Sequence, residues 1–422
     1  MDIRALVGKN VCIVGFGREG QAALRGLRRY APTARITVAD TAPVEVPAEI
    51  PRQLGPRYLE NLERFDVIIK SPGIPPKPEF ERVRSRLTSG TQIFLDTVFQ
   101  HGALVIGVTG TKGKSTTATL IFEVLRAAQK RSFLLGNIGN PALDFLGEAT
   151  SETIFVQECS SYQLMDLSVS PPIAVITSFF PEHLDYHGSI ETYLEAKKHI
   201  TRFQKDTGWV FYNARWEGAR AIAEESPGRK MPFTAADAPL RITETKLLGQ
   251  HNLSNIAAAW LVTEHLGVPK DTALKVFREF PGLPHRLQSL GYHHGILWVD
   301  DSLSTTPEST IAALDAVGDR VVTLILGGHD RDYEFSDLAR EIAKREINGV
   351  VLFPPSGVRI RAALTAAGFP GDVLETESMG DAVRWVRERA RGGVCLLSPA
   401  SPSYGLFKNF EERGDRFWEA IQ

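Results

Sequence analysis

The stretch GVTGTKGKSTT, residues 107–117, decides how the middle of this chain folds. It follows an apolar run with the pattern of a buried strand, and a helical pattern begins at about residue 114. A strand, a glycine-rich turn and a helix start together aim backbone N–H groups and the positive end of a helix dipole at one point, which suits a phosphate group. The common phosphate-loop pattern places a glycine five residues before Gly113, and Val108 stands there instead. The stretch therefore predicts an α/β unit with a phosphate loop of a less common kind.

Four residues of this loop carry the expected chemistry. Gly110 and Gly113 have no side chain, so the backbone can approach an anion closely. The ammonium group of Lys114 can reach the β- and γ-phosphates of a nucleotide, and the hydroxyl group of Ser115 can bind Mg²⁺. We therefore expect the loop to bind a nucleotide.

Short apolar runs alternate with amphipathic stretches along all 422 residues, which is the pattern of α/β units around parallel sheets. At about 150 residues per domain, this length predicts about three domains. The segment FPGLPH (280–285) has the prolines and glycine of a linker. We expect an α/β fold with a Rossmann-like domain at 1–98, a central phosphate-loop domain with a parallel sheet at 99–282, and a second Rossmann-like domain at 283–422. The expected strands are VCIVGFG, RITVAD, FDVIIKSPG, ALVIGVTG, TIFVQE, IAVITSFF, ILWVDDS, VVTLILGG, GVVLFP and GVCLLSP, and the clearest helices are 18–30 and 114–129.

The composition excludes some classes of partner. With 23% charged residues and a net charge of −2, the chain has no electrostatic field strong enough to favour nucleic acid or a membrane surface. No apolar run approaches the roughly 18 residues that a membrane-spanning helix needs. Three widely spaced cysteines, Cys12, Cys159 and Cys395, lie in strand-like runs and suit a reducing compartment. We expect a cytoplasmic protein, a monomer, without nucleic acid partners or membrane insertion.

A second glycine motif lies near the N-terminus. GFGREG (15–20) is a complete G-x-G-x-x-G between an expected strand and an expected helix, and Asp40 ends the next strand. Taken alone, this fingerprint predicts a dinucleotide site and an NAD-dependent oxidoreductase. The same backbone geometry binds any diphosphate, so both readings stay open at this point.

The middle of the chain holds further polar candidates. Glu158 ends an expected strand, where its carboxylate could complete a Mg²⁺ shell together with Ser115. His183, Asp185 and His187 form H-x-D-x-H, which raises a zinc site as an alternative. No further ligands stand at a plausible spacing for zinc, so we consider a zinc hydrolase the weaker hypothesis.

Several motifs occur together in one order, and their order and spacing carry a resemblance. TGTKGKST is similar to the phosphate loop of the Mur ligase family, which also lacks the first glycine of the common pattern. The chain then follows the family with E-x-S-S-x-Q, H-x-D, Y-x-x-A-K, G-x-H-N-x-x-N, H-R, D-S and F-K-N-F-E-x-R-G. KSPGIPP (70–76) resembles the element that closes over uridine in this family. The resemblance covers essentially the full length, and the last motif is the most specific.

The resemblance implies an ATP-dependent ligase of peptidoglycan synthesis, and thus a role in cell wall biogenesis, cell shape and cell division. Its C-terminal motif resembles the members that add D-glutamate to UDP-N-acetylmuramoyl-L-alanine through an acyl phosphate. The implied cofactors are ATP and Mg²⁺, with two ions, and Lys197 is expected to be carbamylated because a free ammonium group cannot bind a cation. Lys198 lies beside it, so the register of this motif is a point for the structure to decide. The implied catalytic residues are Lys114, His183 and Lys197, and the implied metal ligands are Ser115, Glu158, His183 and Lys197.

The resemblance also implies three substrate sites. The expected ATP site comprises Gly110, Thr111, Lys112, Gly113, Lys114, Ser115, Thr116, Asn252, Asn255, Arg286 and Asp301. The expected UDP-sugar site comprises Gly15, Gly17, Arg18, Glu19, Asp40, Thr41, Ser71, Pro72, Gly73, Asn137, Ser160 and Gln163. The expected glutamate site comprises Thr305, Arg331, Ser403, Tyr404 and Phe410.

Three residues depart from the family pattern. Lys112 stands where asparagine is usual, and Arg331 stands where lysine is usual, which keeps a cation able to bind a carboxylate. Leu303 replaces the lysine of the usual N-D-S-K-A-T-N segment, so a cation is lost near the expected glutamate site. A ligase that adds L-glutamate to the same acceptor is therefore the first alternative. The NAD-dependent oxidoreductase and a UDP-sugar binder without catalysis are alternatives of other classes.

Overall fold

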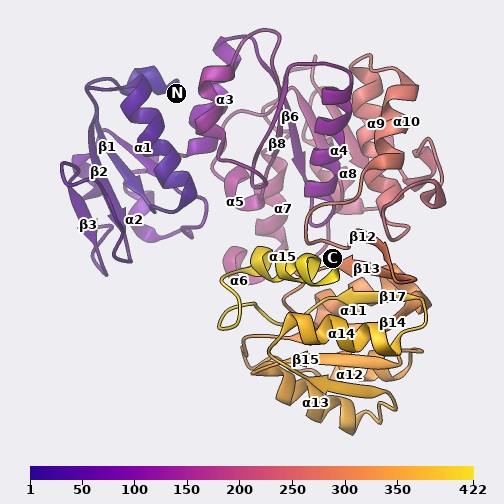
Figure 1. The fold of residues 1–422 in the computed structure, drawn as a ribbon. Coiled ribbons are helices and arrows are strands. Elements are labelled where there is room, and N and C mark those ends of the chain that lie inside the picture. The colour runs from indigo at the N-terminus through magenta and orange to yellow at the C-terminus, as the bar shows by residue number, and fades with distance from the viewer. The chain divides into compact units, whose positions relative to one another are not determined.

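The computed structural model describes all 422 residues, with the side chain of Asp185 left out. The chain forms an α/β structure of three sheets, as the sequence predicts (Figure 1). It divides into two compact units. The first unit comprises residues 1–239 and 253–277, and the second comprises residues 240–252 and 278–422.

The first sheet is entirely parallel, with the strand order β3-β2-β1-β4-β5. Helix α1 (Arg18–Tyr30) coincides with the helix expected at 18–30. Because β1 lies between β2 and β4, the strand order reverses there, and in such sheets ligands bind beyond the carboxyl ends of the strands at this point. The strands are β1 (Asn10–Val14), β2 (Arg35–Asp40), β3 (Arg52–Leu54), β4 (Val67–Lys70) and β5 (Leu87–Thr88), and a short helix α2 (Pro78–Glu81) precedes β5.

The second sheet is also entirely parallel, in the order β11-β10-β9-β6-β8-β7. Its central strand β6 leads directly into the glycine-rich loop. The strands are β6 (Leu104–Thr109), β7 (Ser132–Gly136), β8 (Ile154–Glu158), β9 (Ile173–Ile176), β10 (Trp209–Asn213) and β11 (Arg229–Phe233). The helices are α3 (Gly90–Gln100), α4 (Lys114–Ala127), α5 (Ser161–Leu164), α6 (Leu184–His187), α7 (Ile190–Lys198), α8 (Glu217–Glu224), α9 (Asn252–His265) and α10 (Lys270–Glu279).

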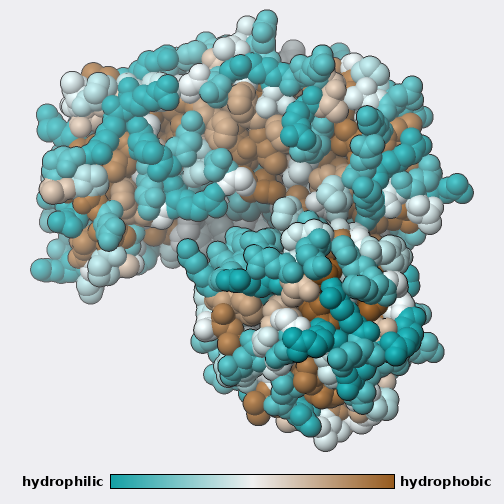
Figure 2. Space-filling model, in the orientation of Figure 1, coloured by the Kyte–Doolittle hydropathy of each residue, from teal (hydrophilic) through white to brown (hydrophobic). Residues whose placement is uncertain are grey.

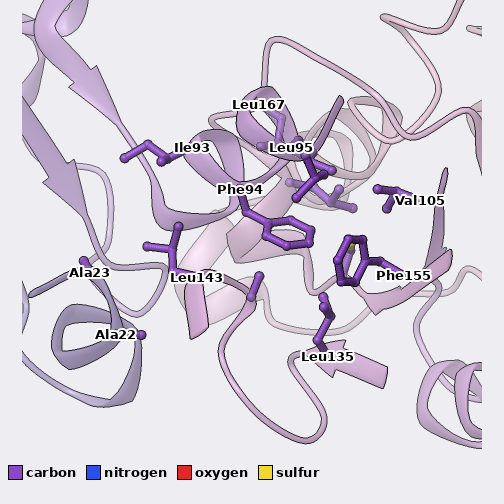
Figure 3. Close-up of a cluster of buried hydrophobic side chains, with 14 of the residues drawn as sticks. Ala22, Ala23, Ile93, Phe94, Leu95, Val105, Leu135, Leu143, Phe155 and Leu167 are labelled. Carbon is purple, nitrogen blue, oxygen red and sulfur yellow. The ribbon is translucent and has the colours of Figure 1, made fainter. Parts of the chain in front are cut away.

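One hydrophobic core joins the first two sheets. Figure 3 shows Phe94 of α3 against Phe155 of β8, with ring centroids 5.2 Å apart in an edge-on arrangement. Leu143, in the 3-10 helix Ala142–Glu148, extends the same cluster toward Ala22 and Ala23 of α1. The expected boundary at residue 98 lies inside α3, so the division of this unit into two domains stays a prediction.

The third sheet has the order β12-β13-β17-β14-β15-β16. Only β12, at its edge, runs antiparallel to its neighbour. The strands are β12 (Gln288–His293), β13 (Ile296–Asp300), β14 (Val321–Gly327), β15 (Gly349–Phe353), β16 (Asp372–Glu375) and β17 (Val394–Leu397). The helices are α11 (Pro307–Val317), α12 (Ser336–Ala343), α13 (Ser356–Ala366), α14 (Met379–Arg389) and α15 (Phe410–Ile421).

The surface is mostly hydrophilic on the face that Figure 2 shows, with apolar residues scattered among polar ones. Large hydrophobic residues that are exposed, such as Tyr292 and Val358, come from separate elements. Among the described residues, no helix combines the length and the apolar character that crossing a membrane requires.

Candidate active site

The glycine-rich loop has a conformation that only glycine adopts easily. Gly110 has φ +151° and Gly113, which caps α4, has φ +87°. A Cβ atom on Gly110 would lie 2.1 Å from Thr177 Oγ1, and one on Gly113 would lie 2.4 Å from Asn255 Oδ1. Both contacts are too short for a side chain, so the two glycines let the loop approach the residues after β9 and helix α9 closely.

Lys114 begins helix α4 and its side chain curls over the loop. Its Nζ donates a hydrogen bond to the carbonyl oxygen of Thr111 at 2.9 Å. Ser115 and Lys114 are half-buried, Thr116 is buried, and Lys112 is exposed. The loop residues of the expected ATP site therefore lie together at the carboxyl end of β6, with a helix N-terminus behind them.

Lys197 lies under the same loop. Its side chain is only 1% exposed, and its Nζ donates hydrogen bonds to Thr109 Oγ1 at 3.2 Å and to the Gly110 carbonyl oxygen at 3.0 Å. Burial, with the nearby positive charge of Lys114, lowers the pKa of Lys197 well below its usual value. The aromatic ring of Tyr193 covers the amine at 4.9 Å. Lys197 is thus a desolvated amine that favours the neutral form.

Lys198 has a different environment, which distinguishes the two lysines. Its ammonium group pairs with Glu225 at 2.9 Å and with Glu195 at 3.5 Å. These hydrogen-bonded partners raise the pKa of Lys198. Of the pair, Lys197 is the lysine that faces the phosphate loop, as the Y-x-x-A-K spacing predicts.

Glu158 ends β8 beside the loop and is 1% exposed. Its Oε1 accepts a hydrogen bond from Asn137 Nδ2 at 2.8 Å. Among the described residues, no group donates a hydrogen bond to its Oε2, although that atom is buried. A buried carboxylate oxygen without a donor is unfavourable, and a cation would satisfy it. The chemistry of this residue therefore fits a Mg²⁺ ligand.

His183 caps helix α6 in the left-handed conformation, with φ +58°. Burial lowers the pKa of His183, and the nearby Lys114, Lys197 and Lys112 act in the same direction, whereas Glu182 opposes them. A neutral imidazole can bind a cation through a ring nitrogen, which suits the predicted role.

His187 points elsewhere. Its Nε2 lies 2.9 Å from Ser161 Oγ and its ring stacks on Tyr162. In the part of the chain that the structure describes, no group of three or more His, Cys, Asp or Glu residues could hold a metal. The side chain of Asp185 lies outside the described part of the chain, and the zinc hypothesis gains no support from the residues around it.

A cavity of about 510 Å³ lies within the first unit, where the strand order of the first sheet reverses. Thr41 is the one residue of the expected UDP-sugar site that does not line it; it lies exposed beside Asp40. The lining residues that the sequence predicted are Gly15, Gly17, Arg18, Glu19, Asp40, Ser71, Pro72, Gly73, Asn137, Ser160 and Gln163. Five further lining residues were not predicted, namely Phe16, Ile74, Gly136, Pro141 and Tyr162. Of these, Phe16, Ile74 and Tyr162 stand inside motifs that the sequence already showed.

Hydrogen bonds shape the cavity wall around the GFGREG loop. Asp40 accepts hydrogen bonds from the backbone N–H groups of Phe16 at 2.7 Å and Ala42 at 3.0 Å. Ser71 Oγ donates to the Gly15 carbonyl oxygen at 2.7 Å, which fastens the KSPGIPP segment to the loop. A Cβ atom on Gly17 would meet nothing within 4 Å, so this part of the loop is open to a ligand.

The opposite wall comes from the start of α5. Ser160 and Gln163 form a reciprocal capping box there, which occupies the Ser160 hydroxyl group. The other end of the Gln163 amide donates to Glu19 Oε1 at 3.2 Å. Burial raises the pKa of Glu19. These contacts place residues from both parallel sheets around one cavity.

The expected glutamate site lies in the second unit, on loops that follow strands of the third sheet. Ser403 is buried, Thr305 and Phe410 are half-buried, and Arg331 and Tyr404 are exposed. These residues follow β13, β14 and β17 or begin α15. Their assignment to glutamate stays a prediction.

Arg413 of α15 ties two of these loops together and was not singled out from the sequence. Its guanidinium donates to Ser302 Oγ at 3.0 Å, to the Ser302 carbonyl oxygen at 2.9 Å and to the Ser401 carbonyl oxygen at 3.0 Å. Burial lowers the pKa of Arg413 to about 9. Its position inside F-K-N-F-E-x-R-G was the one available signal.

The remaining residues of the expected ATP site differ in burial and in hydrogen-bond partners. Asp301 is buried, where its carboxylate accepts from Ser398 Oγ at 2.8 Å and from the Leu287 N–H at 3.1 Å, and burial raises its pKa to about 6. Asn255 Oδ1 accepts from Thr117 Oγ1 at 3.3 Å, close behind the loop. Asn252 Nδ2 donates to the Leu248 carbonyl oxygen, and Arg286 is exposed. Their contact with ATP stays a prediction.

Comparison with known proteins accounts for this arrangement. Residues 108–239 match the model of the Mur ligase middle domain, and residues 285–401 match that of the Mur ligase glutamate ligase domain. The chain belongs to the Mur ligase family. It is 35% identical to a UDP-N-acetylmuramoyl-L-alanine–L-glutamate ligase of Salinispora tropica, over 100% of this chain and 99% of the relative. It is 34% identical to a UDP-N-acetylmuramoylalanine–D-glutamate ligase of Symbiobacterium thermophilum, over 98% of each chain.

Solved structures of Mur ligases share the fold. The MurF ligase of Thermotoga maritima in complex with ADP aligns with a TM-score of 0.62 at 18% identity, over 99% of this chain and 96% of that one. The UDP-N-acetylmuramate–alanine ligase MurC of the same organism aligns with a TM-score of 0.60 at 19% identity, over 97% of this chain and 98% of that one. Membership of this ligase family leaves the oxidoreductase alternative without support. In the GFGREG loop, Asp40 accepts a hydrogen bond from the backbone N–H of Phe16.

Proposed function

We propose that this Mur ligase uses ATP to join glutamate to UDP-N-acetylmuramoyl-L-alanine, a step of peptidoglycan precursor synthesis. The observation that carries the proposal is the group around the phosphate loop. Lys114, the desolvated amine of Lys197 and the unsatisfied oxygen of Glu158 lie on adjacent elements there. The names of the full-length relatives, which are glutamate ligases, support the same substrates.

The reaction couples two steps. The carboxylate of the UDP-sugar substrate attacks the γ-phosphorus of ATP, and ADP leaves with the electrons of the broken P–O bond. The amine of glutamate then attacks the acyl carbon, a tetrahedral intermediate forms and loses a proton, and phosphate leaves as the amide is made. The first step brings two anions together, so positive charge is the main requirement of the site.

The residues described above meet this requirement. Lys114 and the N-terminus of α4 stabilise negative charge on the phosphates. Mg²⁺, when bound, would offset the repulsion between triphosphate and carboxylate, and Ser115, Glu158, His183 and a carbamylated Lys197 would hold it. A neutral lysine amine is the form that reacts with CO₂, and the lowered pKa of Lys197 favours that form. Two ions and the carbamate are parts of this proposal.

We assign the sites to three domains, 1–98 for the UDP sugar, 99–282 for ATP and 283–422 for glutamate. The cavity at the reversal of the first sheet supports the first assignment, because a diphosphate suits a glycine loop at a helix N-terminus. Because the proposed substrates are soluble nucleotides and an amino acid, we propose that the protein is cytoplasmic. We also propose that it is a monomer.

We propose D-glutamate as the amino acid, from the F-K-N-F-E-x-R-G segment. L-glutamate is a second candidate, because Leu303 removes the lysine expected near the amino-acid site, and relatives of both specificities match at similar identity. Phosphate release from ATP, measured with UDP-N-acetylmuramoyl-L-alanine and each enantiomer in parallel, separates the two. Release with L-glutamate alone would leave the chemistry intact and replace D-glutamate. No release with either enantiomer would contradict the proposed acceptor or amino acid, and ADP formed only with substrate would exclude a non-catalytic UDP-sugar binder.

A further inference from the structure

Lys112 is the residue of the phosphate loop that departs from the family pattern, and its backbone is held firmly. Its N–H donates to Ser178 Oγ at 2.9 Å. Its carbonyl oxygen accepts from Thr177 Oγ1 at 2.6 Å and from Ser178 Oγ at 2.9 Å. The Cα atom of Lys112 is therefore fixed, and the four-carbon side chain is its one mobile part.

The ammonium group of Lys112 pairs with the carboxylate of Glu182. The side chain of Lys112 is 69% exposed and that of Glu182 is 26% exposed. The other oxygen of the Glu182 carboxylate lies 3.8 Å from His183 Nε2. Glu182 thus stands between an exposed cation of the phosphate loop and a predicted catalytic histidine.

The segment that carries Glu182 follows the loop closely. The Thr111 N–H donates to the Ser178 carbonyl oxygen at 3.0 Å, and the Phe180 N–H donates to Thr111 Oγ1 at 3.1 Å. Because these bonds hold both backbones, the ion pair is a contact between two fixed segments and does not depend on how the two units of the chain are placed.

We propose that Glu182 is the internal counter-ion of Lys112 and competes with the phosphates of ATP for its ammonium group. This inference rests on the proposed function, since it requires a triphosphate at the loop. A triphosphate carries more negative charge than one carboxylate, and Lys112 belongs to the loop that receives it, so nucleotide binding draws Lys112 away from Glu182. The pair therefore lowers nucleotide affinity. When the pair opens, the Glu182 carboxylate stays next to His183 but no longer has Lys112 as a partner.

Titration calorimetry with the non-hydrolysable analogue AMP-PNP and Mg²⁺, without the other substrates, tests this on the full chain. Glu182→Gln removes the competing charge and should tighten binding about two- to fivefold, the size expected of an exposed ion pair. Lys112→Asn restores the usual family residue and should weaken binding by a similar factor. In the Lys112→Asn background, Glu182→Gln should have no further effect. Added salt should reduce the difference between wild type and Glu182→Gln.

Glu341→Gln is the matched control. This change breaks the ion pair of Glu341 with Lys344 in the second unit. The side chain of Lys344 is 67% exposed and that of Glu341 is 32% exposed, similar to the Lys112–Glu182 pair. This variant should bind AMP-PNP as the wild type does. Circular dichroism confirms that each variant is folded.

The outcomes separate the inference from the proposed function. If Glu182→Gln binds no more tightly than the wild type, or binds more tightly even without Lys112, Glu182 is not the counter-ion that competes with ATP. If the wild type does not bind AMP-PNP at all, the nucleotide site itself, and with it the proposed function, is wrong.

Discussion

Replacing Lys197 with methionine should change how the stability of the protein depends on pH. The folded protein holds Lys197 as a buried amine whose pKa lies well below 10.5, its ordinary value. In the unfolded chain the same amine keeps its proton up to about pH 10.4. Between the two pKa values the unfolded state therefore binds one proton more than the folded state, and the free energy of unfolding rises with pH.

The slope follows from this single proton. One pH unit within the window corresponds to about 1.4 kcal/mol, so the wild type should gain about that much stability per unit as the pH rises toward 10. Methionine has similar length and no charge, so Lys197→Met should lose this gain. The Gly110 carbonyl oxygen and Thr109 Oγ1 lose a donor in the variant, which adds a constant penalty of about 1–2 kcal/mol without changing the slope.

Urea unfolding of both proteins at several pH values, in buffer free of CO₂ so that the amine stays unmodified, measures the difference. Lys198→Met is the control, because the pKa of Lys198 is raised and its stabilising pairs persist until the pH exceeds the ordinary value. Below about pH 10, the free energy of unfolding of Lys198→Met should depend on pH as that of the wild type does. A constant difference between the wild type and Lys197→Met across this range would refute the idea that Lys197 is neutral in the folded protein.

Three further positions test the phosphate loop and the loops that Arg413 holds in the second unit. Lys114→Ala should abolish phosphate release with little change in thermal stability, and near-normal release would remove the loop from the reaction. Gly113→Ala forces φ +87° on a residue with a Cβ atom 2.4 Å from Asn255 Oδ1, which should lower the free energy of unfolding by about 1–3 kcal/mol in urea and weaken nucleotide binding. Arg413→Met should raise the KM for glutamate more than that for ATP, because Ser302 and Ser401 lose their shared donor; equal changes in both constants would favour a general loss of folding. Arg413→Lys should recover part of the effect.

The sequence predicted the positions of residues best where they lie in short motifs along the chain. Gly110, Gly113 and Lys114 lie in one strand–turn–helix unit, so the path of the loop itself follows from consecutive residues. All residues of the expected UDP-sugar site except Thr41 line the cavity of the first unit, because the glycine motifs after β1 and β4 meet where these parallel strands pair. The regular spacing of Y-x-x-A-K likewise identified the buried lysine.

What the sequence missed depends on contacts between distant segments. Arg413 looks like a surface residue of an amphipathic helix, and only the packing of α15 reveals that it binds carbonyl oxygens near residues 302 and 401. Asp301 was assigned to ATP by its motif, which stays a prediction, and its burial in a hydrogen-bond network with Ser398 had no local signal. The pairing of Lys112 with Glu182 spans 70 residues and has no local signal.

The core shared by the first two sheets has a consequence for ligand discovery. Because Phe94, Phe155 and Leu143 pack into one cluster with α1, both walls of the 510 Å³ cavity belong to a single compact unit. Its shape should therefore be present before any substrate arrives, so a small molecule need not supply energy to assemble it. Fragment screening against the unliganded protein, read out as a rise in melting temperature, would then be a practical route to competitors of the UDP sugar.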